Sequence, residues 1–134
     1  MYTWSENLET GNETIDRQHK ELLTRLNMLL GACRDGQGSK EAERTMEFLL
    51  SYTVKHFADE EKAQIQTNYP AYLDHRQRHN DFKKTALALA QELRENGPGE
   101  EFAGRVCSVI GEWLIHHIKG DDFRFAAYMK TRGK

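Results

Sequence analysis

Six histidines are spread along the chain, and their spacing could serve metal binding. His75 and His79 are four residues apart, so on a helix their rings leave the same face one turn apart. His56 and Glu60 repeat this spacing in another segment. A lone histidine on a helix is usually structural or exposed, whereas such pairs can hold one metal ion or reach two neighbouring ions.

Further donors stand near two other helix ends. His19 lies near the start of one predicted helix, and the adjacent His116 and His117 lie near the end of another. Asp121 and Asp122 follow, where the chain could turn a carboxylate inward. Helical periodicity leaves open which member of each adjacent pair faces the interior, since Val109, Trp113 and His116 also make a tolerable stripe.

Four long helices are predicted to position these donors, because apolar residues recur at helical spacing. Asn12 is a good N-cap for the first helix, and Gly36 is predicted to cap its end before a short loop through Gly38 and Ser39. Asn68 to Pro70 and Asn96 to Gly99 stop the next two helices. Gly120 is predicted to end the fourth. The predicted helices span residues 12–34, 40–67, 71–96 and 100–119, with a short final helix over 121–130.

The fold class is predicted to be all-α. Leu and Ala total 24 residues while Val and Ile total 8, a balance that favours helices over strands. Helices of this length with short loops bury their apolar stripes as an antiparallel up-down-up-down four-helix bundle. We expect one domain over residues 1–134, with a non-helical N-terminal arm that Trp4 and Leu8 dock and a short C-terminal helix.

This topology brings the donors together. In an up-down-up-down bundle the start of one helix lies beside the end of the next. His19, His56, His75, His79 and His117 therefore all fall toward one end of the bundle. Unrelated surface histidines need not converge in this way, so the sequence predicts a metal site there.

Composition argues against several classes of partner. With 19 basic and 21 acidic residues the formal net charge is −2, which gives no electrostatic reason to expect nucleic acid or an anionic membrane as a partner. No apolar run approaches a membrane span, and the first residues do not resemble a signal peptide. Cys33 and Cys107 are too few for a disulfide scaffold and are predicted to be small apolar residues. We expect a cytoplasmic location.

The chain resembles the hemerythrin family, and in particular its single-domain bacterial members, the bacteriohemerythrins. The resemblance runs nearly end to end, including the arm with Trp4. It rests on four stretches taken together: GNETIDRQHKELL around His19, HFADEE from His56, NYPAYLDHRQRHNDF around His75 and His79, and WLIHHIKGDD near the end.

The resemblance implies two iron ions between the helices. One would take His75, His79 and His117, and the other His19 and His56. Glu60 and a late aspartate would bridge both ions. The family separates its last histidine and aspartate by five positions, with a Trp four residues before that histidine, which here selects His117, Asp122 and Trp113. His116 and Asp121 would then lie about a quarter-turn off the site.

A count of donors favours ligand binding. Two octahedral ions offer twelve coordination positions. Five imidazoles occupy five of them, two bridging carboxylates occupy four, and one oxo or hydroxo bridge occupies two, which leaves one position open. The open position falls on the iron with His19 and His56. The family relationship therefore implies reversible dioxygen binding for storage, delivery or scavenging. Few carboxylates are present to stabilise high-valent iron, so we expect a binding protein and not an enzyme.

Apolar neighbours are expected to line the open position, namely Phe57, Trp113, Leu114 and Ile118; the same residues would also serve as ordinary core. One departure from the family pattern stands out. Family members usually carry Leu-Met three and four residues after the bridging glutamate, where this chain has Ala63 and Gln64. A smaller and a polar residue could admit water near the irons, and we expect Gln64 to be buried.

Other functions stay open at the level of sequence. The chain could be a sensor of oxygen, nitric oxide or redox state, although it has little room for an output domain. It could be a di-iron peroxidase or nitric-oxide reductase. The imidazoles also suit zinc, copper or nickel. We expect a monomer whose partner is dioxygen.

Overall fold

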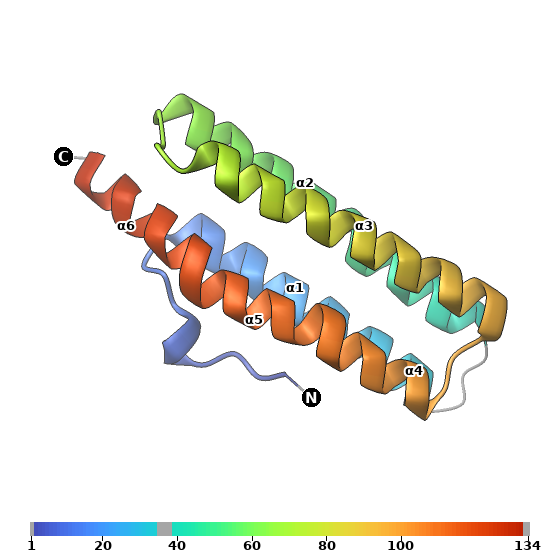
Figure 1. The fold of residues 1–134 in the computed structure, drawn as a ribbon. Coiled ribbons are helices and arrows are strands. Elements are labelled where there is room, and N and C mark those ends of the chain that lie inside the picture. Colours follow the sequence, from blue (N-terminus) through green and yellow to red (C-terminus); the bar gives the residue numbers. More distant parts are fainter. Residues whose placement is uncertain (1, 35–38, 133–134) are drawn as a thin grey trace.

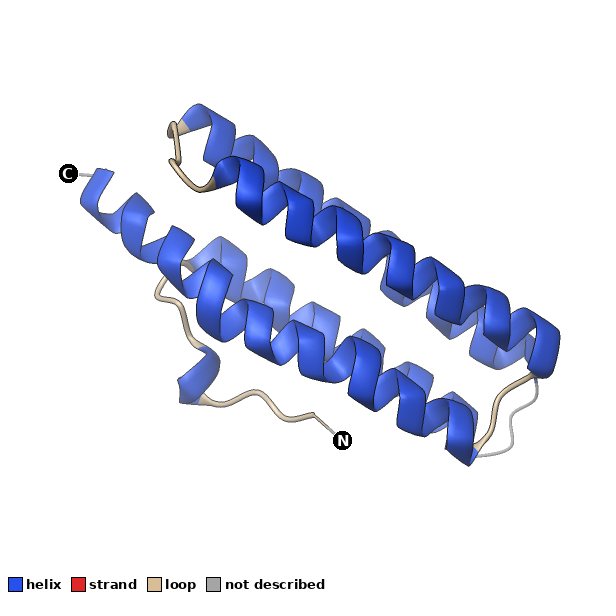
Figure 2. Ribbon diagram, in the orientation of Figure 1, coloured by secondary structure: helices blue, strands red, loops and turns tan. Residues whose placement is uncertain are grey.

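The computed structural model describes residues 2–34 and 39–132, and within these residues every regular element is helical (Figures 1 and 2). This confirms the predicted all-α class. The elements are the 3₁₀ turn η1 (Glu6–Leu8), the helices α1 (Glu13–Arg34), α2 (Ser39–Gln66) and α3 (Tyr72–Asn96), and then α4 (Glu100–Arg105), the π-helical η2 (Val106–Gly111), α5 (Glu112–His117), the π-helical η3 (Ile118–Asp122) and α6 (Phe123–Arg132).

The helices form the predicted up-down-up-down bundle. Figure 1 shows α2 beside α3 and α1 beside the rod that runs from α4 to α6. Helix α1 also contacts α2 and α4. The start of α1, the end of α2, the start of α3 and the region of α6 all lie at one end of the bundle (Figure 1). Leu-rich stripes fill the interior, where Leu22, Leu26, Leu29 and Leu30 are fully buried.

The helix ends agree closely with those predicted. The backbone N–H of Ile15 donates to Oδ1 of Asn12 at 3.0 Å, so Asn12 caps α1 as expected. Gly97 has φ 78°, the left-handed region that favours glycine, and its N–H donates to the Leu93 carbonyl after α3. The predicted cap and loop at Gly36 and Gly38 lie outside the described residues.

The fourth helix continues past Gly120, where the sequence predicted a break. Gly120 lies inside η3, and it is not among the described glycines in the left-handed region, which are Gly11 (φ 88°) and Gly97 (φ 78°). The π-helical turn absorbs an extra residue while the backbone stays right-handed, so the rod needs no break. The expected C-terminal helix is present as α6 and joins α5 directly through this turn.

The N-terminal arm is docked, as predicted. Leu8 is buried with Leu23 and Ile118, and Trp4 packs against this cluster. Tyr2 adds a second attachment, because its backbone and the Asn27 side chain exchange two hydrogen bonds of 2.9 and 2.7 Å. The arm therefore covers the outside of the first and last helices.

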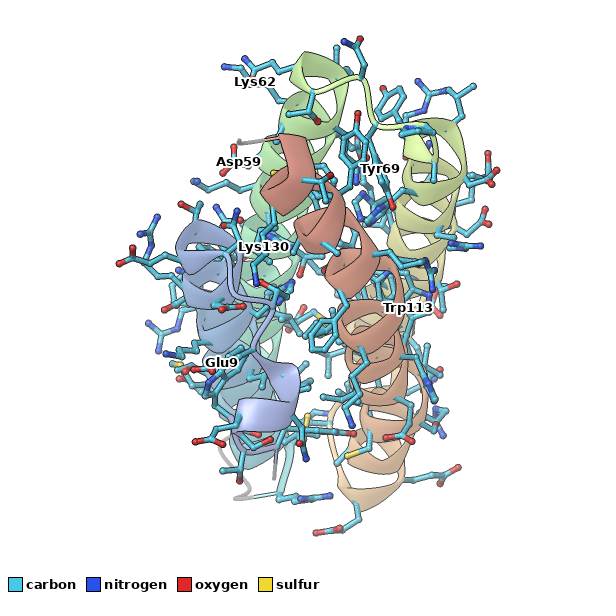
Figure 3. All side chains as sticks on the ribbon, turned by 90° about the vertical axis from the view of Figure 1, so that its left-hand side faces the viewer. Glu9, Asp59, Lys62, Tyr69, Trp113 and Lys130 are labelled. Atoms are coloured by element: carbon cyan, nitrogen blue, oxygen red, sulfur yellow. The ribbon has the colours of Figure 1, made fainter. Side chains whose placement is uncertain are left out.

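Helix α6 closes the end of the bundle against the α2–α3 turn. The Tyr128 hydroxyl donates to the Thr67 carbonyl at 2.6 Å. Tyr69 belongs to this turn, and its side chain packs against α6 (Figure 3), with its ring centroid 4.9 Å from that of Phe125. Lys62 instead points away from the bundle on α2 (Figure 3). Asp59 reaches α1, where the Gln18 amide donates to its Oδ2 at 2.9 Å.

Cys33 belongs to the main apolar core, and Cys107 is half-buried against it. Both thiols are free. None of the helices in the described part of the chain combines the length and apolar character needed to cross a membrane.

Candidate metal centre

Seven donor side chains converge inside the bundle near its α6 end. They come from every long helical element, and none is more than 5% exposed. The donors are His19 on α1, His56 and Glu60 on α2, His75 and His79 on α3, His117 on α5 and Asp122 at the end of η3. These are the seven positions expected as ligands, and the structure brings all of them together.

Two local features aim the donors inward. On α2 and α3 the four-residue spacing places each pair on one helix face. On the last rod, His117 and Asp122 are five residues apart, which an α-helix would turn to different faces. The intervening η3 is π-helical, with i→i+5 bonding, so residues five apart lie about one turn from each other.

The first group of donors contains three imidazoles. Nε2 of His117 lies 2.9 Å from Nε2 of His75 and 3.0 Å from Nε2 of His79. Glu60 Oε1 is 3.0 Å from His75 Nε2 and 3.2 Å from His79 Nε2. Asp122 Oδ1 is 3.0 Å from His75 Nε2 and 3.1 Å from His117 Nε2. Three nitrogens and two oxygens thus face one point.

The second group contains two imidazoles and the other oxygens of the same carboxylates. Asp122 Oδ2 lies 2.7 Å from His19 Nε2 and 3.8 Å from His56 Nε2. Glu60 Oε2 lies 3.9 Å from His56 Nε2. In each group every donor atom is within 4.8 Å of the others. Each carboxylate therefore presents one oxygen to each group, the arrangement of a bridge between two ions.

Hydrogen bonding within the chain does not satisfy these atoms. Both oxygens of Glu60, Oδ1 of Asp122 and Nε2 of His56 are buried and have no hydrogen-bond partner among the residues that the structure describes. Buried carboxylates are costly unless they are paired or coordinate a metal. Imidazole nitrogens and carboxylate oxygens are suitable ligands for iron and zinc. The residues present therefore fit a pair of divalent or trivalent metal ions.

The site electrostatics favour a bound cation. Burial acts to raise the pKa of Asp122, but His117 holds it well below its usual range. Burial and the charge of Asp122 act to raise the pKa of Glu60, yet the close imidazoles of His75 and His79 lower it. Burial opposes protonation of the histidines, and the carboxylates still raise the pKa of His75 to about 9 and of His117 to about 10. The surrounding imidazoles thus favour the ionised form of both carboxylates, whose charge protons or metal ions can balance.

A second layer of side chains holds the imidazole rings by their outer nitrogens. The partners are Gln18 Oε1 at 2.6 Å from His56 Nδ1, Glu61 Oε2 at 2.8 Å from His79 Nδ1, Asp121 Oδ2 at 2.9 Å from His117 Nδ1, and the Gln64 amide at 2.7 Å from His75 Nδ1. A ring that donates its Nδ1–H to an oxygen keeps Nε2 free for a metal.

Sequence reasoning missed most of these outer partners. Gln18 carried a signal, because it is a polar residue on the apolar stripe of Ile15 and Leu22. Asp121 was predicted to lie off the site, and it belongs to neither donor group. The sequence analysis did not foresee that its carboxylate backs His117 and also pairs with Arg78 and Arg124. Its four-residue spacing from His117 was the available signal.

His116 is exposed, whereas His117 is 5% exposed and faces the donors. The structure thus places the adjacent pair in the register that the resemblance selected.

The expected apolar lining residues fall into two environments. Phe57 stacks on His79 with ring centroids 3.8 Å apart, and Trp113 stacks on His117 at 4.4 Å. Leu114 is buried in the same core. Ile118 is also buried, but it packs with the N-terminal arm. Phe57 and Trp113 therefore brace the three-imidazole group directly.

Ala63 and Gln64 have different surroundings. Gln64 is buried as expected, and the described contact of its amide is with the His75 ring. Ala63 lines a cavity of about 250 Å³ together with Gln18, Glu60 and Phe125. The small side chain at position 63 therefore leaves space beside Glu60 on α2.

Comparison with known proteins agrees with this geometry. The model of the hemerythrin HHE cation binding domain matches residues 10–129. A bacteriohemerythrin of Stenotrophomonas maltophilia is 29% identical over 98% of this chain and 83% of its own length. A myohemerythrin of Theromyzon tessulatum is 28% identical over 92% of this chain and 90% of its own length. With its donor groups and a match over nearly all its length, the chain belongs to the hemerythrin HHE cation-binding domain family.

Proposed function

We propose that this chain holds two iron ions in the two donor groups and binds dioxygen reversibly, as a protein for oxygen storage, delivery or scavenging. The observation that carries the proposal is the division of Glu60 and Asp122 between the groups. The Oε1 and Oδ1 atoms face three imidazoles, and the Oε2 and Oδ2 atoms face two. With two ions bound, the group with two imidazoles would have one ligand fewer from the chain than the group with three.

The side chains have distinct parts in this function. Glu60 and Asp122 would each give one oxygen to each ion and would supply negative charge. Gln18, Glu61 and Asp121 orient the imidazoles through their Nδ1 atoms. When bound, the iron pair supplies the electrons that reversible dioxygen binding requires.

The apolar residues keep water from the centre. Phe57 is fully buried between the His79 and His56 rings, and its flat contact with His79 limits motion of that ring. Trp113 does the same for His117. We assign Phe57, Trp113, Leu114 and Ile118 to the lining around the ligand position. A dry lining favours reversible binding, because water assists the loss of bound oxygen as a reduced product.

The donor set supports binding in preference to oxygen activation. It is rich in imidazole, which binds a metal as a neutral ligand, and holds only two carboxylates within the two groups. Carboxylate-rich di-iron sites with paired Glu-x-x-His motifs belong to the ferritin-like pattern. We further propose that the chain acts as a cytoplasmic monomer with dioxygen as its partner, and with neither nucleic acid nor a membrane, in keeping with its net charge of −2.

Metal analysis with anaerobic reduction and re-aeration tests the function. The isolated protein should contain two irons per chain, and air should convert the reduced, colourless form to a coloured one that argon or vacuum reverses. Azide should bind once per chain to the oxidised form. One tightly held zinc per chain, or turnover with a reductant in place of reversible colour, would overturn the proposal.

A further inference from the structure

Among the described residues, Gln64 is the one outer partner of the imidazoles that contacts its ring through a nitrogen. Its amide Nε2 lies 2.7 Å from Nδ1 of His75, and its Oε1 is buried without a partner. The rings of His56, His79 and His117 instead have an oxygen at Nδ1. Gln64 is completely buried, so its amide has few alternatives to this contact.

The inner nitrogen of His75 is committed to the donor groups. Its Nε2 lies 3.0 Å from both Glu60 Oε1 and Asp122 Oδ1. A metal at this point needs the Nε2 lone pair, so the ring must carry its proton on Nδ1. Nδ1–H then requires an acceptor at the position of the Gln64 amide.

A glutamine can meet this requirement by turning its terminal amide through half a turn. The amide has both a donor and an acceptor at similar distances from the chain, so rotation places Oε1 where Nε2 stands. This gives the unpartnered Oε1 a hydrogen bond from Nδ1–H. A methionine, which the family pattern usually has here, offers no comparable acceptor.

We propose that Gln64 is a positioning residue for the metal centre: its amide oxygen accepts the Nδ1–H of His75 and so keeps Nε2 of that ring free and aimed at the metal. The inference rests on the proposed metal centre. It assigns Gln64 to the three-imidazole group, alongside Glu61 for His79 and Asp121 for His117. All three rings of that group then have a hydrogen-bond partner at Nδ1. In the other group the described residues provide such a partner for His56 but not for His19.

Three variants separate this role from simple packing. Gln64→Met removes the strong acceptor and keeps an unbranched side chain of similar length. Gln64→Glu retains an oxygen acceptor at the same reach. Gln66→Met makes the first substitution at an exposed position on the same helix and serves as the matched control.

The first measurement is the rate at which each iron(II)-loaded protein releases its metal to a colour-forming chelator without oxygen. The melting temperature of each metal-free protein is measured alongside. Loss of an outer partner of a ligating histidine typically weakens metal binding about 10- to 100-fold, so Gln64→Met should release one ion about 10-fold faster. Gln64→Glu and Gln66→Met should stay within about twofold of the parent. Metal-free Gln64→Met should melt no lower than the parent, because it replaces a half-satisfied buried amide.

The second measurement is long-range proton–nitrogen NMR of the imidazoles in zinc-loaded protein. The parent should show His75 protonated at Nδ1, with slow exchange of that proton, and Gln64→Met should exchange it about 10-fold faster or more as the hydrogen bond is lost. This readout does not depend on iron or oxygen chemistry.

The possible failures are distinct. A parent that holds no metal overturns the proposed function together with this inference. A parent with two ions, and Gln64→Met releasing both at the parental rate, overturns the inference alone. Equal faster release from Gln64→Met and Gln64→Glu, with lower melting temperatures in both, would assign Gln64 to packing.

Discussion

Asp122 Oδ1 lies 3.1 Å from Nε2 of His117, although the two residues are five positions apart on one helical rod. The π-helical turn η3 makes this possible. Asp121 stands on the opposite side of the same ring, with Oδ2 2.9 Å from Nδ1. Two consecutive aspartates therefore hold one imidazole from both sides, and only Asp122 faces the donor groups.

The register of the last helix predicts opposite effects for two adjacent histidines. His117→Ala should abolish or greatly weaken retention of the ion that also uses His75 and His79, because it removes one of three converging nitrogens. His116→Ala should leave metal content unchanged, since His116 is exposed. Metal analysis after dialysis checks both variants, and the reverse result would show that the fourth helix faces the site through His116.

The convergence of most donor side chains could be predicted from sequence because two simple rules combine. Helical spacing pairs His56 with Glu60 and His75 with His79, and bundle topology brings helix starts and ends together. His117 and Asp122 needed the family resemblance, because regular α-helical geometry does not align residues five apart. The π-helical turn carries no composition signal, and Gly120 within it suggested a break.

The outer partners were harder to predict for a physical reason. Glu61 and Asp121 are charged residues beside ligands, and most such residues point to solvent. Whether one of them reaches a ring depends on helix rotation by a fraction of a turn, which hydrophobic periodicity does not fix. Gln18 and Gln64 were more accessible to prediction, because each is an uncharged polar residue on a buried face.

Phe57 should be important for stability as well as for the centre. It is fully buried and stacks on His79 with an interplanar angle of 3°. Phe57→Ala should lower the free energy of unfolding of the metal-free chain by about 3–5 kcal/mol, the usual cost of emptying a buried aromatic site. Phe48→Ala is the control at 46% exposure and should cost no more than about 0.5–1 kcal/mol. Denaturant unfolding measures both, and equal costs would contradict the packing described.

Two glycines on the last rod should respond to alanine with opposite signs. A Cβ at Gly111 would overlap the Tyr2 hydroxyl, whereas a Cβ at Gly104 meets nothing within 4 Å. Gly111→Ala should displace the arm and cost about 1–3 kcal/mol. Gly104→Ala should stabilise the helix by about 0.5–1 kcal/mol. Melting temperatures give the sign, and limited proteolysis should cut the first residues faster in Gly111→Ala alone. A Gly111→Ala variant that is more stable than the parent would show that the Tyr2 hydroxyl does not pack against Gly111.

Attachment of the arm should weaken in alkaline solution because of Tyr2. Its hydroxyl donates to the Cys107 carbonyl at 3.1 Å, and burial, with the nearby Cys107 and Glu112, raises its pKa to about 12. An unfolded tyrosine titrates near pH 10. The folded state therefore favours the neutral phenol, so its stabilising contribution is complete below about pH 10 and is lost as the pH rises from about 10 to 12.

Tyr2→Phe should be less stable than the parent by about 1 kcal/mol at neutral pH, through loss of one hydrogen bond. The difference in melting temperature between parent and Tyr2→Phe should shrink across that alkaline range, and the absorbance titration of the parent should show one late-titrating phenol that Tyr2→Phe lacks. A difference that stays constant or widens above about pH 10 would mean that the hydroxyl is free to ionise in the folded chain.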